Sequence, residues 1–340
     1  MNMATNPRNL AIIGPGRMGQ LYARIIQELA TTRLVAIGGR SEASTQALAR
    51  AHNVPGYADS AYETMLAAHP EIDAVIVAAS EWAHRAPVLT ALRAGKHVLV
   101  EKPMAISAAD ATAMVEAAEQ AGVRLLVCHS LRFDLRFAAM RQAVADGAIG
   151  EVLHLYARRN PAQAAVERVL GRFPLAYWLA PHDIDMMLWT TGSPVTKVMA
   201  YSRAGGKMRE DFIIAVLTFA NGAIGGLESS WGTPAVSGRL QNELFTVRGT
   251  AGAVEVLGQE NGVAVYRTGN PPEYPDTGYT PVLHDQQEGM FRRLIHHVAG
   301  VLRDQWPPVV TGADGLAAIR VAAAIDRSLA EGQEVAVASV

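Results

Sequence analysis

Cysteine is almost missing from this sequence: among 340 residues there is one, Cys128. A single cysteine excludes an intrachain disulfide, and chains that lack disulfides are typical of reducing compartments. We therefore expect a cytoplasmic location. Cys128 ends the apolar run 125–128, which favours a buried structural thiol over a reactive nucleophile.

Charge and long apolar runs are also scarce. Charged residues make up 18% of the chain and the formal net charge is −2, so no basic surface for nucleic acid and no polybasic membrane-binding segment is visible. The apolar runs fall short of the roughly 20 residues that span a bilayer. Glycines at 14–19 interrupt the first apolar stretch before it resembles a signal peptide. We expect a small-molecule substrate, with no nucleic acid, membrane or metal as partner.

What the sequence has in quantity is apolar residues, 50% of the chain, and at this length two domains are expected. In residues 1–129, short apolar strands alternate with helical patterns. This order indicates an α/β domain, a doubly wound Rossmann-like parallel sheet covered on both faces. Strands are predicted at 10–13, 34–37, 73–79, 97–100 and 124–128, and helices at 18–30, 42–52, 82–94 and 107–121.

In residues 130–340 the pattern changes to alternating strands separated by tight-turn pairs, Asn221-Gly222 and Asn261-Gly262. We predict a second, α+β domain with a large, mainly antiparallel open sheet for substrate binding and oligomerisation. Its C-terminal helix, predicted at 315–330, can pack back on the first domain. Strands are predicted at 152–157, 195–201, 212–220, 223–231, 244–248 and 263–266, helices at 135–146 and 315–330, and a loop at 270–276.

A glycine motif follows the first predicted strand and opens the first helix. Gly14, Gly16 and Gly19 have the G-x-G-x-x-G spacing of a dinucleotide-binding turn. The first glycine permits the tight turn, the second lets backbone approach a pyrophosphate, and the third lets helix and strand pack closely. Free N–H groups at the helix start meet the phosphate charge. We therefore predict cofactor contacts from Gly14, Gly16, Arg17, Met18 and Gly19.

The second predicted strand ends at Gly39-Arg40-Ser41 instead of at the acidic residue common in NAD sites. Without that carboxylate, a 2′-phosphate meets no repulsion, and an arginine with a hydroxyl can bind it. We predict cofactor contacts from Gly39, Arg40 and Ser41, and favour NADP over NAD. The alternative is that Arg40 only stacks on adenine.

Further motifs accompany the glycine turn: 94–103 (A-G-K-H-V-L-V-E-K-P), Arg132-Phe133, 182–185 (H-D-I-D) and 249–252 (G-T-A-G). With them, the sequence resembles the glucose–fructose oxidoreductase/inositol dehydrogenase (Gfo/Idh/MocA) family over essentially its whole length. The resemblance implies NAD(P)-dependent hydride transfer at a carbinol or carbonyl carbon of a sugar, cyclitol or related cyclic substrate. It also implies a homodimer or homotetramer.

The resemblance assigns roles to Glu101-Lys102-Pro103, which follows a predicted parallel strand. Lys102 matches the family lysine between nicotinamide and substrate, so we expect it to accept the hydroxyl proton, or to polarise the carbonyl in reverse. Glu101 and Pro103 are expected beside the cofactor, with a cis bond before Pro103. Where the family usually has a Thr-Pro-Asn-like turn, this chain has Ala79-Ser80-Glu81, whose backbone we still expect beside the nicotinamide ribose. His84 keeps the place of the family histidine, the alternative being a histidine on the helix surface.

The H-x-x-D element gives His182 as the second proton-handling or substrate-binding residue, with Asp185 on the same helix face to orient it or to hold the helix. We expect substrate contacts from Arg132, Arg158, Trp178, His182, Asp185 and Trp231, with Tyr279 as a further lining residue.

One departure from the family pattern bears on function. Trp178 stands where many members have an aspartate four residues before the histidine, and Ala180 replaces a glycine. Trp178 is suited to stack on a sugar face or a planar substrate, or else it is core. Two alternatives therefore stay open: a cofactor-binding regulator without turnover, and a glycosidase or lyase in which bound NAD oxidises the substrate transiently.

Overall fold

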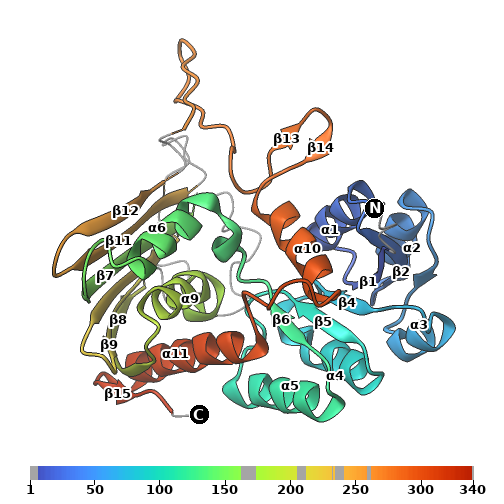
Figure 1. Ribbon diagram of the computed structural model, residues 1–340, viewed down its shortest axis with the longest axis horizontal. Coiled ribbons are helices and arrows are strands. Elements are labelled where there is room, and N and C mark those ends of the chain that lie inside the picture. The colour runs from blue at the N-terminus through green and yellow to red at the C-terminus, as the bar shows by residue number, and fades with distance from the viewer. Residues whose placement is uncertain are drawn as a thin grey trace. The chain divides into compact units, whose positions relative to one another are not determined.

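The computed structural model describes residues 7–161, 174–204, 212–231, 233, 241–258 and 262–338 (Figure 1). The chain forms two compact units. Unit 1 contains residues 1–130 and 280–316, and unit 2 contains residues 131–279 and 317–340. Residues 280–316 therefore group with the first sheet, although the sequence analysis had assigned them to the second domain. The reason is helix α10 (Met290–Val301), which packs on α1 and brings Phe291 edge-on to Tyr22.

Unit 1 is a six-stranded parallel sheet in the order β3-β2-β1-β4-β5-β6. This confirms the doubly wound α/β fold, and the order reverses between β1 and β4, where such sheets bind ligands. The strands are β1 (Arg8–Ile13), β2 (Thr32–Gly38), β3 (Gly56–Tyr57), β4 (Ala74–Val77), β5 (His97–Val100) and β6 (Leu125–Val127). The helices between them are α1 (Arg17–Glu28), α2 (Glu42–Ala51), α3 (Tyr62–Ala68), η1 (Glu81–Ala83), α4 (Arg85–Arg93) and α5 (Ala108–Ala121).

Several unit 1 elements differ from the prediction. The short β3 and α3 were not predicted, and the helix predicted at 82–94 is the 3₁₀ turn η1 followed by α4. Pro87 fits there because it lies in the first turn of α4, where its missing N–H has no intrahelical acceptor. The hairpin β13 (Val282–Leu283) and β14 (Gln286–Gln287) precedes α10.

Unit 2 contains a seven-stranded sheet in the order β12-β11-β7-β10-β9-β8-β15. Only the β7–β10 pair is parallel, so the predicted mainly antiparallel sheet is confirmed. The strands are β7 (Val152–Pro161), β8 (Val195–Arg203), β9 (Phe212–Phe219), β10 (Ile224–Ser230), β11 (Gln241–Gly249), β12 (Ala253–Leu257) and β15 (Val335–Ala336). The helical elements are η2 (Ser130–Phe133), α6 (Leu135–Ala145), α8 (Leu175–Trp178), α9 (Ala180–Thr191) and α11 (Gly312–Glu331), whose residues the two units share.

One predicted strand is wrong: residues 263–266 contribute only an isolated bridge, Val265 to Glu273. The Asn221-Gly222 turn joins β9 to β10 as expected, with Gly222 at φ +88°, whereas Asn261 lies outside the described residues. Among the described residues, no helix combines the length and the apolar character that a membrane span requires.

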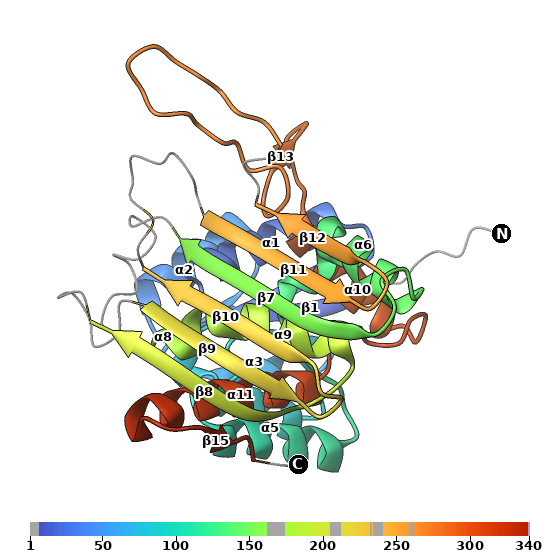
Figure 2. The ribbon, with the colours of Figure 1, turned by 90° about the vertical axis from the view of Figure 1, so that its left-hand side faces the viewer.

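The two faces of the unit 2 sheet differ. Helices α8 and α9 pack on one face, over β7, β9 and β10, and the opposite face is turned to the viewer in Figure 2. Large apolar side chains are exposed there on four strands, β8, β9, β10 and β12: Tyr201, Ile214, Val216, Ile224 and Leu257. The unit therefore has one covered face and one open face.

Candidate active site

The glycine turn between β1 and α1 packs against the end of β4. Gly14 has φ +112°, and a Cβ on it would lie 2.4 Å from the carbonyl oxygen of Ala78. A Cβ on Gly19 would lie 1.9 Å from the carbonyl oxygen of Gly14, whereas a Cβ on Gly16 would meet nothing within 4 Å. Gly16 caps α1 without a side-chain bond, and the first turn holds no acidic residue. These residues fit the pyrophosphate of a dinucleotide, because open backbone N–H groups and an open surface coincide. Arg17 is exposed and Met18 is half-buried at the same helix start.

The end of β2 has no room for an acidic side chain. A Cβ on Gly39 would lie 2.3 Å from Thr45 Oγ1 and 2.8 Å from Pro15 Cδ. Arg40 and Ser41 are exposed, and the Ser41 hydroxyl caps α2 by accepting from the Ser44 N–H. The missing carboxylate is thus a packing requirement of this chain. It leaves a guanidinium, a hydroxyl and a helix start at the edge of the sheet.

His84 ties two strand ends together. Its Nδ1 lies 3.0 Å from the Pro103 carbonyl oxygen, and its Nε2 lies 3.1 Å from the Ala79 carbonyl oxygen. The ring is 1% exposed, and because carbonyls only accept, both contacts are hydrogen bonds only when both nitrogens carry protons. The glycine turn, the end of β4 with its exposed Ser80, and the turn after β5 therefore form one contiguous surface of unit 1.

Lys102 lies on the turn after β5, and the Lys102–Pro103 bond is cis, as expected. Lys102 is half-buried, and its N–H donates to Glu101 Oε2 at 3.0 Å. The other carboxylate oxygen, Oε1, accepts from the Tyr22 hydroxyl at 2.5 Å. Tyr22 Oη also lies 2.9 Å from Cys128 Sγ. The buried Cys128 thiol confirms the structural interpretation of this cysteine, while Tyr22 was missed by the sequence analysis.

In unit 2, two buried arginine–aspartate pairs hold the helix that carries His182. Asp183 accepts from Arg159 Nε and Nη2 at 2.9 Å each. Asp185 accepts from Arg132 Nε at 3.0 Å and Nη2 at 2.6 Å. All four side chains are at most 4% exposed, and such bidentate pairs fix orientation as well as charge. Half-buried His182 lies on α9 directly before the first of these anchors, Asp183. Asp185 thus holds the helix, one of its two expected roles, and Arg132 is its partner.

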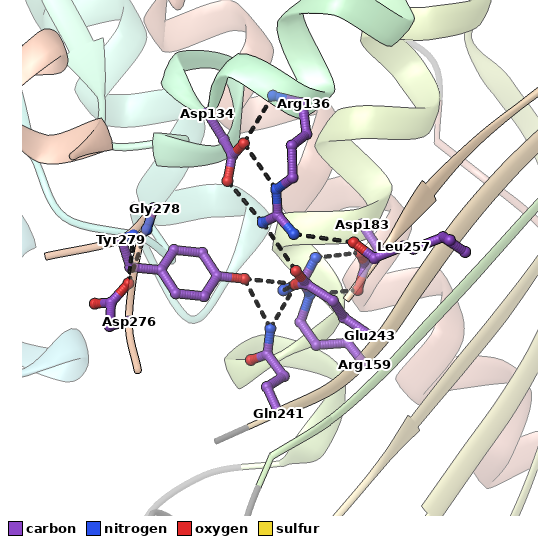
Figure 3. A network of polar contacts seen from close by, with 10 residues as sticks. All are labelled: Asp134, Arg136, Arg159, Asp183, Gln241, Glu243, Leu257, Asp276, Gly278 and Tyr279. Carbon is purple, nitrogen blue, oxygen red and sulfur yellow. Dashed lines mark hydrogen bonds and ion pairs between the residues drawn. The ribbon is translucent and has the colours of Figure 1, made fainter. Parts of the chain in front are cut away.

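The Asp183 anchor belongs to a wider network (Figure 3). Arg159 Nη1 donates to Glu243 Oε2 at 2.9 Å, and the Tyr279 hydroxyl donates to the same oxygen at 2.5 Å. Arg136 pairs with Asp134 and with Glu243. Burial opposes the charge on Arg159, but Asp183 and Glu243 outweigh it and raise its pKa well above the usual value. Burial, reinforced by Glu243, likewise raises the pKa of Tyr279. Tyr279, expected to line the substrate site, therefore bonds within this network.

Two tryptophan rings pack against each other at a tilt in unit 2. The ring centroids of Trp178 and Trp231 lie 4.8 Å apart with 35° between the planes. Trp231 is 6% exposed, and its Nε1–H has no hydrogen-bond partner among the described residues. Trp178 is half-buried and lies four residues before His182. The structure thus joins these two predicted substrate residues into one aromatic pair, of which Trp178 is the more exposed member.

Arg158 is placed apart from the His182 helix. Neighbouring residues of a strand point to opposite faces, and Arg159 reaches α9, so Arg158 lies on the other face. Its neighbours on that face, Tyr156 and Asn160, both bond to Glu228. The structure therefore does not bring Arg158 together with His182. The prediction missed Arg159, and strand alternation was the signal that separates it from Arg158.

Comparisons with known proteins agree with this architecture. Residues 8–129 match the family model described as an oxidoreductase family with an NAD-binding Rossmann fold, and residues 141–337 match the C-terminal alpha/beta domain of the same oxidoreductase family, GFO_IDH_MocA. The chain is 28% identical to an inositol 2-dehydrogenase of Rhizobium meliloti (strain 1021), over 96% of this chain and 98% of the relative. It is 27% identical to a myo-inositol 2-dehydrogenase of Thermotoga maritima, over 96% and 97%.

A solved structure has the same fold. The scyllo-inositol dehydrogenase from Lactobacillus casei with bound NAD(H) and scyllo-inositol superposes with a TM-score of 0.81 at 21% identity. The match covers 98% of this chain and 100% of that chain.

Proposed function

Because the chain belongs to the Gfo/Idh/MocA family of oxidoreductases, with an NAD-binding Rossmann domain, we propose that it transfers a hydride to or from a carbinol or carbonyl carbon of a cyclitol or cyclic sugar. The relatives named as inositol dehydrogenases support this substrate class. The observation that supports the proposal best is the position of Lys102. Its turn contacts His84 at Pro103, His84 contacts Ala79, and Ala79 lies against the glycine turn.

In this proposal the chain's own residues hold and move one proton. When bound, the nicotinamide ring supplies the hydride acceptor or donor. The Lys102 Nζ accepts the proton from the substrate hydroxyl during oxidation and polarises the carbonyl oxygen during reduction. His182 shares that proton or holds the hydroxyl, and its helix is fixed by Asp183 and Asp185. Half-buried Trp178, supported by the buried Trp231 ring, offers an aromatic face for a ring substrate.

The Lys102→Met variant tests the catalytic role. It removes the ammonium that we propose handles the substrate proton, so kcat falls by about 10²–10⁴-fold while cofactor affinity stays nearly unchanged. The measurement is absorbance at 340 nm with a panel of cyclitols and sugars, together with cofactor titration by fluorescence. Full turnover by the variant contradicts the role.

The same assays separate the alternatives. Turnover of a substrate without net change at 340 nm identifies transient oxidation, as in a glycosidase or lyase. Cofactor binding without turnover of any panel member identifies a regulator. These alternatives are tested because half-buried Trp178 stands where many family members have an aspartate.

NADP is the cofactor that we propose this chain prefers. Packing against Thr45 and Pro15 keeps an acidic side chain away from position 39, and Arg40 with Ser41 offers a guanidinium, a hydroxyl and a helix start to a 2′-phosphate. Comparing the KM for NADP and for NAD tests this directly. A lower KM for NAD contradicts the preference.

We also propose a homodimer or homotetramer built on the open face of the unit 2 sheet. Exposed Ile214 and Val216 lie there beside Tyr201, which is 61% exposed. Burial of such a face is favourable in proportion to its apolar area. The Ile214→Lys, Val216→Lys double variant should dissociate the oligomer in light-scattering measurements, and a monomeric wild type contradicts the proposal. The cytoplasmic location stays a prediction.

A further inference from the structure

The turn that carries Lys102 is attached to the first helix of unit 1 by a short buried chain of polar groups. Tyr22 comes from α1, one turn after Gly19, and its side chain is fully buried. Its hydroxyl is 2.5 Å from Glu101 Oε1, and Glu101 Oε2 accepts the Lys102 N–H. Two hydrogen bonds therefore connect the helix of the glycine turn to the backbone of Lys102.

The direction of these hydrogen bonds follows from the available protons. The Tyr22 hydroxyl donates its single proton to Glu101 Oε1, so it does not also donate to Cys128. The Tyr22 oxygen then accepts from the Cys128 thiol, 2.9 Å away. Burial, reinforced by Glu101, raises the pKa of both Tyr22 and Cys128, so both protons are retained. The order is Cys128 S–H to Tyr22 O–H to Glu101, which in turn holds the Lys102 N–H.

The other side of the turn is held by His84, which contacts the Pro103 carbonyl oxygen. Lys102 thus lies between two buried contacts, one through Glu101 and one at Pro103. Removing either should let the turn shift, and a shift of about 1 Å at a catalytic group can cost about 10²-fold in rate. We expect the position of the turn to depend more on Glu101, because its carboxylate is 9% exposed and is oriented by the Tyr22 hydroxyl.

We propose that Tyr22 is a positioning residue for Lys102, acting through the Glu101 carboxylate, with Cys128 as the donor that keeps the Tyr22 hydroxyl directed. This rests on the proposed function, in which Lys102 handles the proton. In this proposal Tyr22, a fully buried residue of the cofactor-binding helix, supports the proton-transfer site without contacting the substrate.

The test compares two tyrosine hydroxyls of unit 1. Tyr22→Phe removes the hydroxyl on Glu101, and Tyr57→Phe removes a half-buried hydroxyl that contacts His69 Nε2 at 3.0 Å. We expect Tyr22→Phe to lower kcat about tenfold with less than a twofold change in cofactor KM, and Tyr57→Phe to leave both unchanged. Cys128→Ser keeps a donor and should retain activity, whereas Cys128→Ala should lose part of it.

A second readout needs no substrate. The sequence contains only four lysines, Lys96, Lys102, Lys197 and Lys207, so reductive ¹³C-methylation gives a simple NMR spectrum. Lys102→Arg assigns the Lys102 signal. We expect Tyr22→Phe to move the chemical shift and titration midpoint of that signal, while Tyr57→Phe leaves them in place.

The outcomes separate this inference from the proposed function. An unmoved Lys102 signal in Tyr22→Phe, a kcat within twofold of wild type, or equal losses in both tyrosine variants overturns the positioning role. A moved signal in Tyr22→Phe combined with full turnover by Lys102→Met overturns the proposed function and retains the attachment of the turn. Without turnover of any panel substrate, the NMR comparison decides the inference alone.

Discussion

The three glycines of the turn after β1 have different surroundings, and this separates folding from binding at single residues. Gly14 and Gly19 face backbone atoms at distances no side chain tolerates, whereas Gly16 faces open space. Two of the glycines are therefore fixed by the fold itself. The third, Gly16, is free of such contacts, and we propose that a phosphate group approaches the backbone there.

Alanine substitutions should separate these roles. Gly19→Ala forces a methyl into the Gly14 carbonyl and should destabilise unit 1 by about 1–3 kcal/mol. Gly16→Ala should leave stability within about 1 kcal/mol of wild type and weaken dinucleotide binding about tenfold, or about 1.4 kcal/mol. Thermal unfolding with and without cofactor measures both effects. Equal cofactor affinity in Gly16→Ala and wild type would show that the pyrophosphate binds elsewhere.

Single residues also show how far the sequence leads. The glycine fingerprint and the segment around Lys102 are local patterns, so roles can be predicted for them from the sequence without coordinates. Tyr22 is separated by 79 residues from Glu101, and only the sheet order brings them together. Tyr22 on its own is one more large residue on an apolar helix face.

At the scale of elements, α9 depends on charges that are buried together. Arg159 pairs with Asp183 and Glu243, which are 1% and 3% exposed. The Arg159→Met variant leaves both carboxylates without that guanidinium, so it should destabilise unit 2 by about 3–5 kcal/mol. Chemical denaturation measures the loss.

A surface pair of the same sheet is the control for that measurement. Arg248 pairs with Glu255 on β11 and β12, with 62% and 46% of the side chains exposed. Arg248→Met should change stability by no more than about 0.5 kcal/mol, because solvent screens exposed pairs. An equal loss of unfolding free energy in Arg159→Met and Arg248→Met would show that the buried network does not stabilise unit 2 more than an exposed pair does.

The elements themselves were predicted unevenly, for physical reasons. Buried parallel strands such as β4 are continuous apolar runs and were found. The strand predicted at 152–157 extends to Pro161, and those last residues contain Arg159 and Asn160, whose polarity hid them. Their burial is possible because they pair with Asp183 and Glu228, and such tertiary pairing leaves no local signal in the sequence.

For the whole molecule, acid should lower stability through two half-buried histidines of unit 1. His97 Nδ1 accepts the Arg124 N–H at 2.9 Å, and His297 Nε2 accepts the Val309 N–H at 3.1 Å. Burial lowers the pKa of both, helped by Arg124 for His97 and by His296 for His297. In each case protonation also removes the lone pair that accepts the hydrogen bond.

The sign of the pH effect follows from linkage. A histidine whose folded pKa is depressed binds fewer protons than it does in the unfolded chain, so its stabilisation is complete above about pH 6.5 and is lost as the pH falls below that value. We expect the Tm to fall by several degrees between pH 7 and pH 5. His97→Asn, which keeps an acceptor, should flatten the curve, and exposed His154→Asn should not. Parallel curves for wild type and His97→Asn would contradict this assignment.

The single cysteine, Cys128, directly after β6, can report the rate of local opening around the Lys102 turn. Cys128 is 1% exposed and touches Tyr22, so a thiol-specific reagent reaches it only when the packing around the Lys102 turn opens. Since the chain has no second cysteine, one labelling rate reports one local opening event. Cofactor that binds the closed form should slow labelling in proportion to occupancy. The local opening of the packing around the Lys102 turn can therefore be timed without a substrate.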